Sequence, residues 1–395
     1  MPASRRFILT AAAGVLALVV GGCNTASSDP TFGRVPVAPP SPSMQTSPSA
    51  EPCTTAARLA AWSLERLAYQ TLTVPAQQTS VSSASAYVAA GAGGVILFGS
   101  KAPSTLGKSI AALTAKAPDG VPPFIMTDEE GGSVQRMPNV VGRIPSARTM
   151  AATMTPAQIH DLALAAGKKL RGVGVTMDLA PVLDLDDRAG PSPANPDGTR
   201  SFSLDPKRAS AAGLAFMKGL QDSGVVPVVK HFPGLGYSTA NSDNAAAKTR
   251  SWADLQKRDL RPFQDAVAAG VPAVMMANAS VPGLTTLPAG LSPEAVTTVL
   301  RGQLQYDGLV ITDSLSATAV KAAGYRVPQA TVQALIAGVD MVMYTEAAGN
   351  VAKVTQQTVA AIVAAVNAGK LPRDRLLNAV GHILAAKKVD LCKAA

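Results

Sequence analysis

Histidine, cysteine and aromatic residues are scarce in this sequence of 395 residues, which has three histidines, three cysteines and 4% Phe, Trp and Tyr. Cysteines at positions 23, 53 and 392 cannot build a metal cluster. No run of five or more Lys and Arg occurs, and few aromatic rings are available to stack on bases. These absences argue against a cysteine-bound metal centre and against nucleic-acid binding.

The first 22 residues are typical of an export signal. Arg5 and Arg6 precede an apolar run, residues 7–20, that is too short for a comfortable membrane span. A pair of glycines stands directly before Cys23, as in the lipobox of bacterial lipoproteins, where the cysteine is lipidated and becomes the new N-terminus. We therefore predict export and a lipid anchor on the outer face of the cell membrane. The export route stays open, because the paired arginines also fit a twin-arginine signal loosely.

Residues 23–52 are rich in Ser, Pro, Thr and Ala, and they have too few large apolar side chains to offset chain entropy. We expect a flexible tether there, followed by a folded domain over residues 53–395. In an exported protein, Cys53 and Cys392 at the two ends of this domain suggest a disulfide, and two free thiols are the alternative. Removing Arg5 and Arg6 lowers the formal charge from +9 to +7, and this scattered excess is typical of a solvated exterior.

Eight short apolar runs alternate with Ala-rich stretches of helical periodicity. Continuous rather than alternating apolar runs indicate strands that are covered on both faces, as in a parallel sheet. The pattern predicts a (β/α)8 TIM-like barrel. A doubly wound open sheet is the alternative, but its glycine-rich fingerprint is missing after the early strands. The predicted strands are residues 70–74, 94–98, 123–127, 174–180, 225–229, 272–277, 308–312 and 340–344.

Charged side chains gather directly after these runs, where a barrel of this type carries its active site. Asp128 opens "DEEGGSVQR" after the third run, Lys230 and His231 follow the fifth, and Asp313 ends the seventh. Nearby positive charge would keep Asp313 ionised, so that it could act as a nucleophile at a sugar carbon or as a base. The alternatives are that Asp313 caps the following helix and that Asp128 belongs to an acidic surface loop.

Six motifs, in consistent order from about residue 59 to residue 389, resemble the N-terminal barrel of glycoside hydrolase family 3. The similarity is greatest to the single-domain bacterial β-N-acetylglucosaminidases of that family. The resemblance implies that Asp313 is the nucleophile that forms a covalent glycosyl-enzyme. It also implies that Asp128, Arg200, Lys230 and His231 contact the sugar in the non-reducing subsite. The motifs are "DEEGGSVQR", "MDLAPVLDL", "RSFSLDP", "KHFPGLG", "YDGLVITDSLSA" and "ALIAGVDMVM".

The loop after "KHFPG" departs from the pattern of that branch, in which an Asp-Ser-His segment supplies an acid/base dyad. Leu235 stands in place of a histidine, and Asn241 and Asp243 occupy the dyad region. Our preferred hypothesis is that Asp243 is the acid/base, oriented by Asn241 and buried enough to raise its pKa. The alternatives are Asp186 or Asp187 from another loop, or no acid/base at all. The small and polar residues of this loop favour mobility.

Together these features predict a retaining exo-β-N-acetylglucosaminidase that acts on peptidoglycan-derived fragments without metal or cofactor. Its expected partners are glycans that contain N-acetylglucosamine and, through the lipid anchor, the membrane. We expect a monomer and no nucleic-acid partner. Two alternatives are a family 3 glycosidase with another sugar preference and a catalytically impaired sugar-binding surface lipoprotein.

Overall fold

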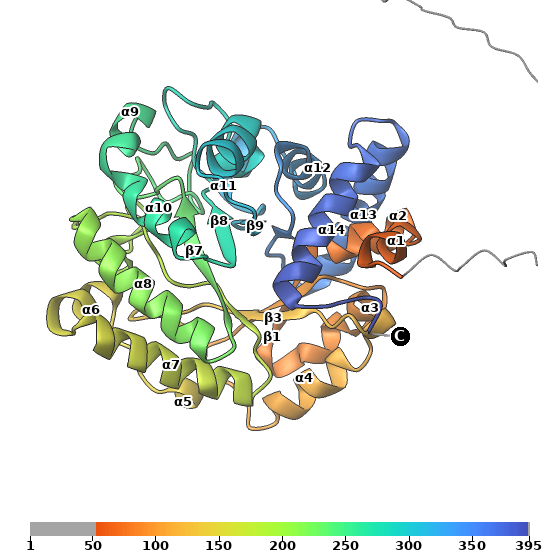
Figure 1. Cartoon of the computed structure of the whole chain (residues 1–395), viewed down its shortest axis with the longest axis horizontal. Helices are drawn as coiled ribbons and strands as arrows, with labels where there is room; N and C mark the ends of the chain where they lie inside the picture. The colour runs from red at the N-terminus through yellow and green to blue at the C-terminus, as the bar shows by residue number, and fades with distance from the viewer. Residues whose placement is uncertain (1–52, 394–395) are drawn as a thin grey trace, which may run out of the picture. The chain divides into compact units, whose positions relative to one another are not determined.

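The computed structural model describes residues 53–393 of the chain. The predicted export signal, Cys23 and the whole of the predicted tether lie outside these residues. Within them no helix is long and apolar enough to cross a membrane. The central feature is an eight-stranded parallel sheet with helices around it (Figure 1).

All eight predicted strands are present. They are β1 (Leu72–Gln77), β2 (Gly94–Phe98), β3 (Phe124–Thr127), β6 (Met177–Asp178), β7 (Val226–Phe232), β8 (Ala273–Met276), β9 (Leu309–Thr312) and β10 (Val342–Met343). Their order in the sheet is β10-β1-β2-β3-β6-β7-β8-β9. A parallel bridge between Ile311 and Met341 joins the two ends of this order. The barrel is therefore confirmed, and the open-sheet alternative is wrong.

Helices surround the strands and supply the outer layer of the core. They are α1 (Thr55–Ala60), α2 (Leu64–Gln70), α3 (Ser85–Ala89), α4 (Leu106–Thr114), α5 (Pro138–Val141), α6 (Ala147–Thr153), α7 (Pro156–Gly172), α8 (Pro206–Asp222), α9 (Trp252–Asp254), α10 (Arg261–Ala268), α11 (Thr318–Ala322), α12 (Val327–Ala337), α13 (Val351–Asn367) and α14 (Arg373–Lys387). The segments Leu255–Asp259 and Glu294–Gln303 are wound as π-helix. Short 3-10 turns, of which Gln78–Ala84 is the longest, complete the connections.

Apolar residues cover both faces of the strands, which explains why the apolar runs in the sequence are continuous rather than alternating. On β2, Ile96 packs in the barrel interior with Met126, Met177 and Ile311. Its neighbours Val95 and Leu97 pack in the separate cluster between strands and helices. Successive strand residues point to opposite faces, so a strand covered on both sides needs no polar alternation.

Two strand boundaries differ from the sequence prediction in ways that matter for the site. Strand β7 continues to Phe232, so Lys230 and His231 belong to the strand itself rather than to the loop after it. The segment after β3 folds back as an antiparallel hairpin of β4 (Glu129–Gly131) and β5 (Val134–Gln135). Sequence periodicity cannot locate these changes, because polar residues end the apolar pattern before the backbone leaves the sheet.

The two ends of the described chain are joined by the disulfide Cys53–Cys392, with Cα atoms 5.9 Å apart. Near this link the Thr55 hydroxyl donates to Asp390 over 3.0 Å, and Arg373 on α14 donates to the carbonyl of Ala60. The disulfide that the cysteine positions suggest is thus present in the structure.

We expect Cys392→Ser to lower the free energy of unfolding by about 3 kcal/mol, because the cross-link restricts the unfolded chain. Urea denaturation with and without reducing agent measures this. Cys53→Ser and the double variant should show the same loss, and none of the three should respond to reducing agent. A double variant much less stable than either single variant would show that the cysteines act independently.

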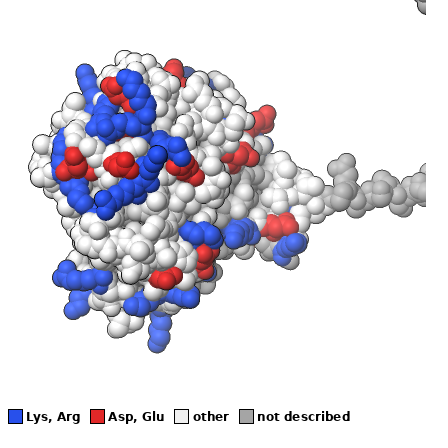
Figure 2. Space-filling model, turned by 60° about the vertical axis from the view of Figure 1, so that its left-hand side comes forward, with Lys and Arg blue, Asp and Glu red and all other residues white. Residues whose placement is uncertain are grey.

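Basic side chains on the outer surface have acidic side chains among them on the face shown in Figure 2. Interspersed charge of this kind creates no large field of a single sign. That face therefore offers no broad basic patch of the kind that binds nucleic acid.

Candidate active site

A cavity of about 380 Å³ lies at the carboxyl ends of the barrel strands. It brings together the six candidate catalytic and substrate-binding residues, which come from four separate strand ends. Glu130, which the sequence analysis did not single out, lies among them. Its ionisable residues and its one amide are Asp128, Glu130, Arg136, Arg200, Lys230, His231, Asn241, Asp243 and Asp313.

Glu130 is the centre of a buried ion-pair cluster in this cavity. Lys230 Nζ lies 2.7 Å from Glu130 and 3.0 Å from Asp128. Arg200 donates to both Glu130 oxygens over 2.8 Å. Burial alone would raise the pKa of Glu130, but Arg200 and Lys230 hold it far below its usual range. A signal for Glu130 was available in the sequence, because it lies two residues after Asp128 and so on the same face of an extended chain.

His231 is fixed by Asp184, another residue that sequence reasoning missed. Its Nδ1 lies 2.6 Å from an Asp184 oxygen, and the same carboxylate accepts the backbone N–H groups of His231 and Leu235. Burial, followed by the nearby Arg200 charge, lowers the pKa of His231 to about 4. A neutral imidazole that donates through Nδ1 presents Nε2 as an acceptor. The structure thus favours His231 as an acceptor from a sugar hydroxyl.

Asp197 is buried beside this pair, and neither of its carboxylate oxygens has a hydrogen-bond partner among the described residues. Burial raises the pKa of Asp197 to about 8, and that of Asp184 to about 7. Ligand atoms of Asp184, Asp197 and His231 lie within 4.8 Å of one another, a donor set that a divalent cation could use. The Asp184 oxygens already accept three N–H groups, however, and a protonated Asp197 is a poor ligand. These residues therefore fit a buried, partly neutral cluster better than a metal site.

Asp313 directly follows β9 and faces the cavity. Its Oδ1 accepts the N–H of Ser314 over 2.6 Å, and its own N–H donates to the carbonyl of Met276 on β8. Helix α11 begins only at Thr318, with Ala317 at its N-cap, so the helix-cap alternative for Asp313 is wrong. Burial raises the pKa of Asp313, and the Asp243 charge adds to this, while His231 and Lys230 oppose it. The sequence analysis expected nearby positive charge to dominate at Asp313. This expectation is wrong, because the net effect raises the pKa of Asp313.

Asp243 lines the same cavity, but its side chain is exposed at the rim rather than buried. Asn241 Oδ1 accepts the backbone N–H of Asp243 over 3.0 Å. The amide side chain thus holds the main chain under Asp243 and does not bind its carboxylate. Our expectation that burial acts on Asp243 is therefore wrong, because the loop leaves this carboxylate open to solvent.

The two alternative acids are engaged elsewhere. Asp186 accepts from the backbone and guanidinium of Arg188, which hold the pKa of this carboxyl below its usual value although burial opposes the shift. Asp187 accepts the Tyr237 hydroxyl. Neither carboxylate lines the cavity that contains Asp313. Of the three candidates, only Asp243 is placed to meet a ligand bound there.

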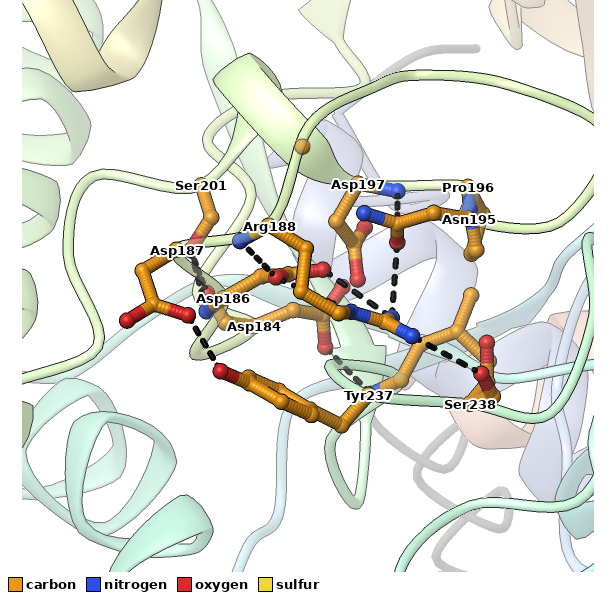
Figure 3. A network of polar contacts seen from close by, with 12 residues as sticks. Asp184, Asp186, Asp187, Arg188, Asn195, Pro196, Asp197, Ser201, Tyr237 and Ser238 are labelled. Atoms are coloured by element: carbon orange, nitrogen blue, oxygen red, sulfur yellow. Dashed lines mark hydrogen bonds and ion pairs between the residues drawn. The ribbon is translucent and has the colours of Figure 1, made fainter.

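Arg188 ties the loop of Asp243 to the loop that follows β6 (Figure 3). Its guanidinium donates to Asn195 over 2.8 Å and to the carbonyl of Ser238 over 3.5 Å. It also lies 4.5 Å from the centroid of the Tyr237 ring, and the Arg250 guanidinium lies 4.1 Å from the same centroid. Tyr237 has a left-handed backbone, with φ of 59°, which few non-glycine residues adopt. These contacts join the loop of Asp243 to the loop that follows β6.

We expect Arg188→Ala to lower kcat about tenfold on a natural disaccharide, because loss of these contacts releases the loop of Asp243. An activated aryl glycoside should lose much less, since its leaving group needs little protonation. Initial rates on both substrates measure this. Arg188→Lys, which keeps the charge without the planar fork, should recover only part of the loss. Exposed Lys207→Ala provides the control, and equal losses on both substrates would contradict the positioning role.

Eight parallel strands and a polar cavity lined by four carboxylates, among them Asp313 and Asp243, are the features of a barrel enzyme of the glycosidase type. The family described as "Glycosyl hydrolase family 3 N terminal domain" matches residues 66–386. The chain belongs to glycoside hydrolase family 3 and is a glycoside hydrolase.

The named relatives match between about two thirds and nearly all of the chain. The "Beta-hexosaminidase LpqI" of Mycobacterium tuberculosis is 34% identical over 98% of this chain and 97% of its own length. A "Beta-hexosaminidase" of Nitrosospira multiformis is 36% identical over 64% of this chain and 72% of its own. A solved glycosyl hydrolase of the same family from Mycobacterium smegmatis has a TM-score of 0.75 at 32% identity. It covers 83% of this chain and 98% of its own.

Proposed function

We propose that this protein is a retaining exo-β-N-acetylglucosaminidase that acts on peptidoglycan-derived glycans outside the cell membrane. The observation that carries the proposal is that Asp313 and Asp243 line one cavity together with the cluster of Asp128, Glu130 and Lys230. The relatives from Mycobacterium tuberculosis and Nitrosospira multiformis are both named β-hexosaminidases, and one solved structure, at 31% identity, is described as a β-N-acetylglucosaminidase. These names support the choice of sugar.

The size and polarity of the cavity suit a single terminal sugar. Its volume of about 380 Å³ lies at the small end of ligand pockets. Asp128 offers carboxylate oxygens to sugar hydroxyls, Lys230 and Arg200 offer N–H groups, and His231 offers Nε2. Because Glu130 neutralises part of the charge on Lys230 and Arg200, a neutral sugar can bind without a carboxylate or phosphate of its own.

In the first chemical step we assign Asp313 as the nucleophile. Its carboxylate oxygen attacks the anomeric carbon, the glycosidic C–O bond breaks, and Asp243 gives its proton to the leaving oxygen. In the second step Asp243 takes a proton from water, which attacks the same carbon and releases the sugar with retained configuration. The free carboxylate of Asp313 is regenerated, so protons and bonds balance over the cycle.

The raised pKa of Asp313 is compatible with this role. Burial favours the neutral acid over the carboxylate, which makes the charged form more reactive toward an oxocarbenium-like carbon. When the glycosyl ester forms, the negative charge on Asp313 disappears from a site that stabilises it poorly. The same environment therefore favours the covalent intermediate relative to the free enzyme.

We also propose that the chain is exported and anchored by a lipid on Cys23, on the evidence of residues 1–23. Replacing Cys23 by alanine should move the protein from the membrane fraction to the soluble fraction of the producing cells. Metabolic labelling with a radioactive fatty acid should mark the wild type only. Membrane association that survives the substitution would contradict the anchor.

The proposed reaction is tested with aryl β-glycosides of N-acetylglucosamine, N-acetylgalactosamine and glucose. We expect the first substrate to be preferred, and NMR of the early product should show the β-anomer before mutarotation. Added phosphate should not divert the product to a sugar phosphate if water is the acceptor. A first-formed α-anomer would refute the retaining mechanism, and a preference for glucose would refute the sugar assignment.

A further inference from the structure

A cavity of about 590 Å³ lies at the amino ends of the barrel strands, at the end opposite the one that carries Asp313. Its wall includes Phe124 and Val226, the first residues of β3 and β7. It also includes Thr176 and Pro272, which stand directly before β6 and β8. No residue lines both this cavity and the one that contains Asp313, so the two are separate.

Helix α14 closes this end of the barrel and ends at a buried amine. Ile383 belongs to the apolar cluster of the barrel interior, and Ala386 packs against that cluster. Lys387 follows as the last residue of α14, and its Nζ lies 5.3 Å from the centroid of the Phe124 ring. Part of the Lys387 side chain is open to solvent, but Nζ is buried and has no hydrogen-bond partner among residues 53–393. The amine therefore lacks the acceptors that a buried polar group requires.

The charged groups that line this cavity are all cations. Arg171 and Lys388 line it together with Lys387, and no Asp or Glu does. Burial lowers the pKa of Lys387 well below its usual value, and the charge of Arg66 on α2 lowers it further. The carboxylate beside Arg66 is that of Asp119, which lies 3.4 Å from the Arg66 guanidinium. The lining of the cavity thus supplies Lys387 with like charges and with no counter-ion.

We propose that this cavity binds a phosphate group, of a free anion or of a lipid headgroup, with the Lys387 amine as its innermost contact. A phosphate would supply the acceptor oxygens that Lys387 lacks and would offer further oxygens to Arg171 and Lys388. The planar guanidinium of Arg171 matches phosphate geometry. Negative charge beside Lys387 favours its ammonium form, so the anion and a proton bind together. The inference does not depend on the proposed function, because the active-site cavity is at the other end of the barrel.

Two features of the cavity favour the lipid headgroup as the source of the phosphate. The disulfide links Cys392, five residues after Lys387, to Cys53, so the chain that leads to the proposed lipid anchor begins close to α14. An apolar wall beside the cations could hold the glycerol and first methylene groups of a lipid. The residues of this wall are Pro122, Pro123, Phe124, Val225, Val226, Pro227 and Pro272.

Titration of inorganic phosphate into the purified full-length protein, followed by calorimetry, tests the site. We expect saturable binding that weakens at least about tenfold in Lys387→Met, which loses a charge-assisted contact. Binding should weaken severalfold in Arg171→Gln, whose parent side chain is exposed. Exposed Lys353→Met on α13 is the control and should bind as the wild type does. Affinity that is unchanged in both Lys387→Met and Arg171→Gln would overturn the site.

Proton uptake distinguishes the buried amine from a surface cluster of permanently charged groups. Sulfate does not itself titrate near neutral pH, so it is titrated there in two buffers that differ in ionisation enthalpy. The difference in heat between the buffers should show net proton uptake by the wild type. The same uptake is expected in Arg171→Gln and not in Lys387→Met. Binding without proton uptake in the wild type would overturn the role of Lys387.

Dihexanoyl phosphatidylglycerol, used below its micelle concentration, distinguishes the two sources. Binding of this lipid at least about tenfold tighter than inorganic phosphate, and lost in Lys387→Met, would support the headgroup. Equal affinity of the two ligands, lost in the same variant, would support the free anion. Lipid binding that persists undiminished in Lys387→Met would place the lipid elsewhere and refute the headgroup.

Discussion

Asp313→Asn should lower kcat by at least about 10⁴-fold on every substrate, because an amide cannot form the glycosyl ester. The fold should survive this change. Asn keeps a side-chain oxygen that can accept the Ser314 N–H, and the main-chain bond to Met276 does not depend on the side chain. Thermal unfolding and initial rates, measured on the same preparation, separate the catalytic effect from a structural one.

Asp307→Asn is the matched control, since the Asp307 side chain is fully exposed and the chemical change is the same. A slowly hydrolysed 5-fluoro glycosyl fluoride of the same sugar should label the wild type, and mass spectrometry should place the added glycosyl mass on the peptide that contains Asp313. Activity of Asp313→Asn within tenfold of wild type, or label on another carboxylate, would remove Asp313 from the nucleophile role.

The barrel could be predicted from the sequence because its strands are covered on both faces. A doubly covered strand needs an unbroken apolar run, and eight such runs alternate with helical periodicity. The ends of the strands could not be predicted as well, since β7 continues through Lys230 and His231 after the apolar pattern has stopped. Backbone pairing with neighbours decides where a strand ends, and a single sequence does not show that pairing.

For the site, the sequence analysis identified the residues that line the cavity and missed the buried residues that hold them in place. Asp184 and Glu130 are buried and act on His231, Lys230 and Arg200 from other segments of the chain. Their roles depend on distances between residues tens of positions apart, which no local pattern encodes. The direction of the pKa shift of Asp313 failed for the same reason, because it depends on how completely the surrounding loops bury the carboxylate.

The loop of Asp243 shows what remains predictable when a family motif is altered. The sequence located the segment that faces Asp313, and the structure places Asp243 at the rim of the shared cavity. It also shows Asn241 supporting the main chain rather than the carboxylate. The structure therefore favours Asp243 over Asp186 and Asp187 by position and accessibility, without the burial that the hypothesis first invoked.

Asp243→Asn should accordingly lower kcat/KM on a natural disaccharide by about 10²- to 10³-fold, within the range of general acid catalysis. The loss should be much smaller for cleavage of a nitrophenyl glycoside, whose leaving group departs without a proton. With that substrate the second step becomes rate-limiting, because no base activates the water. The glycosyl-enzyme should therefore accumulate, and its formation should appear as a burst of released nitrophenol. Stopped-flow absorbance and steady-state rates on both substrates measure these effects.

Azide provides the decisive control, since it attacks the glycosyl-enzyme without needing a general base. It should restore turnover of the nitrophenyl glycoside in Asp243→Asn, form the β-glycosyl azide, and leave the wild-type rate nearly unchanged. Neighbouring Asn244→Asp, which adds a carboxylate one position further along the exposed loop, should not restore the disaccharide activity in the Asp243→Asn background if position decides function. Full activity of Asp243→Asn on the disaccharide would show that the proton comes from another group, because an amide at this position cannot supply it.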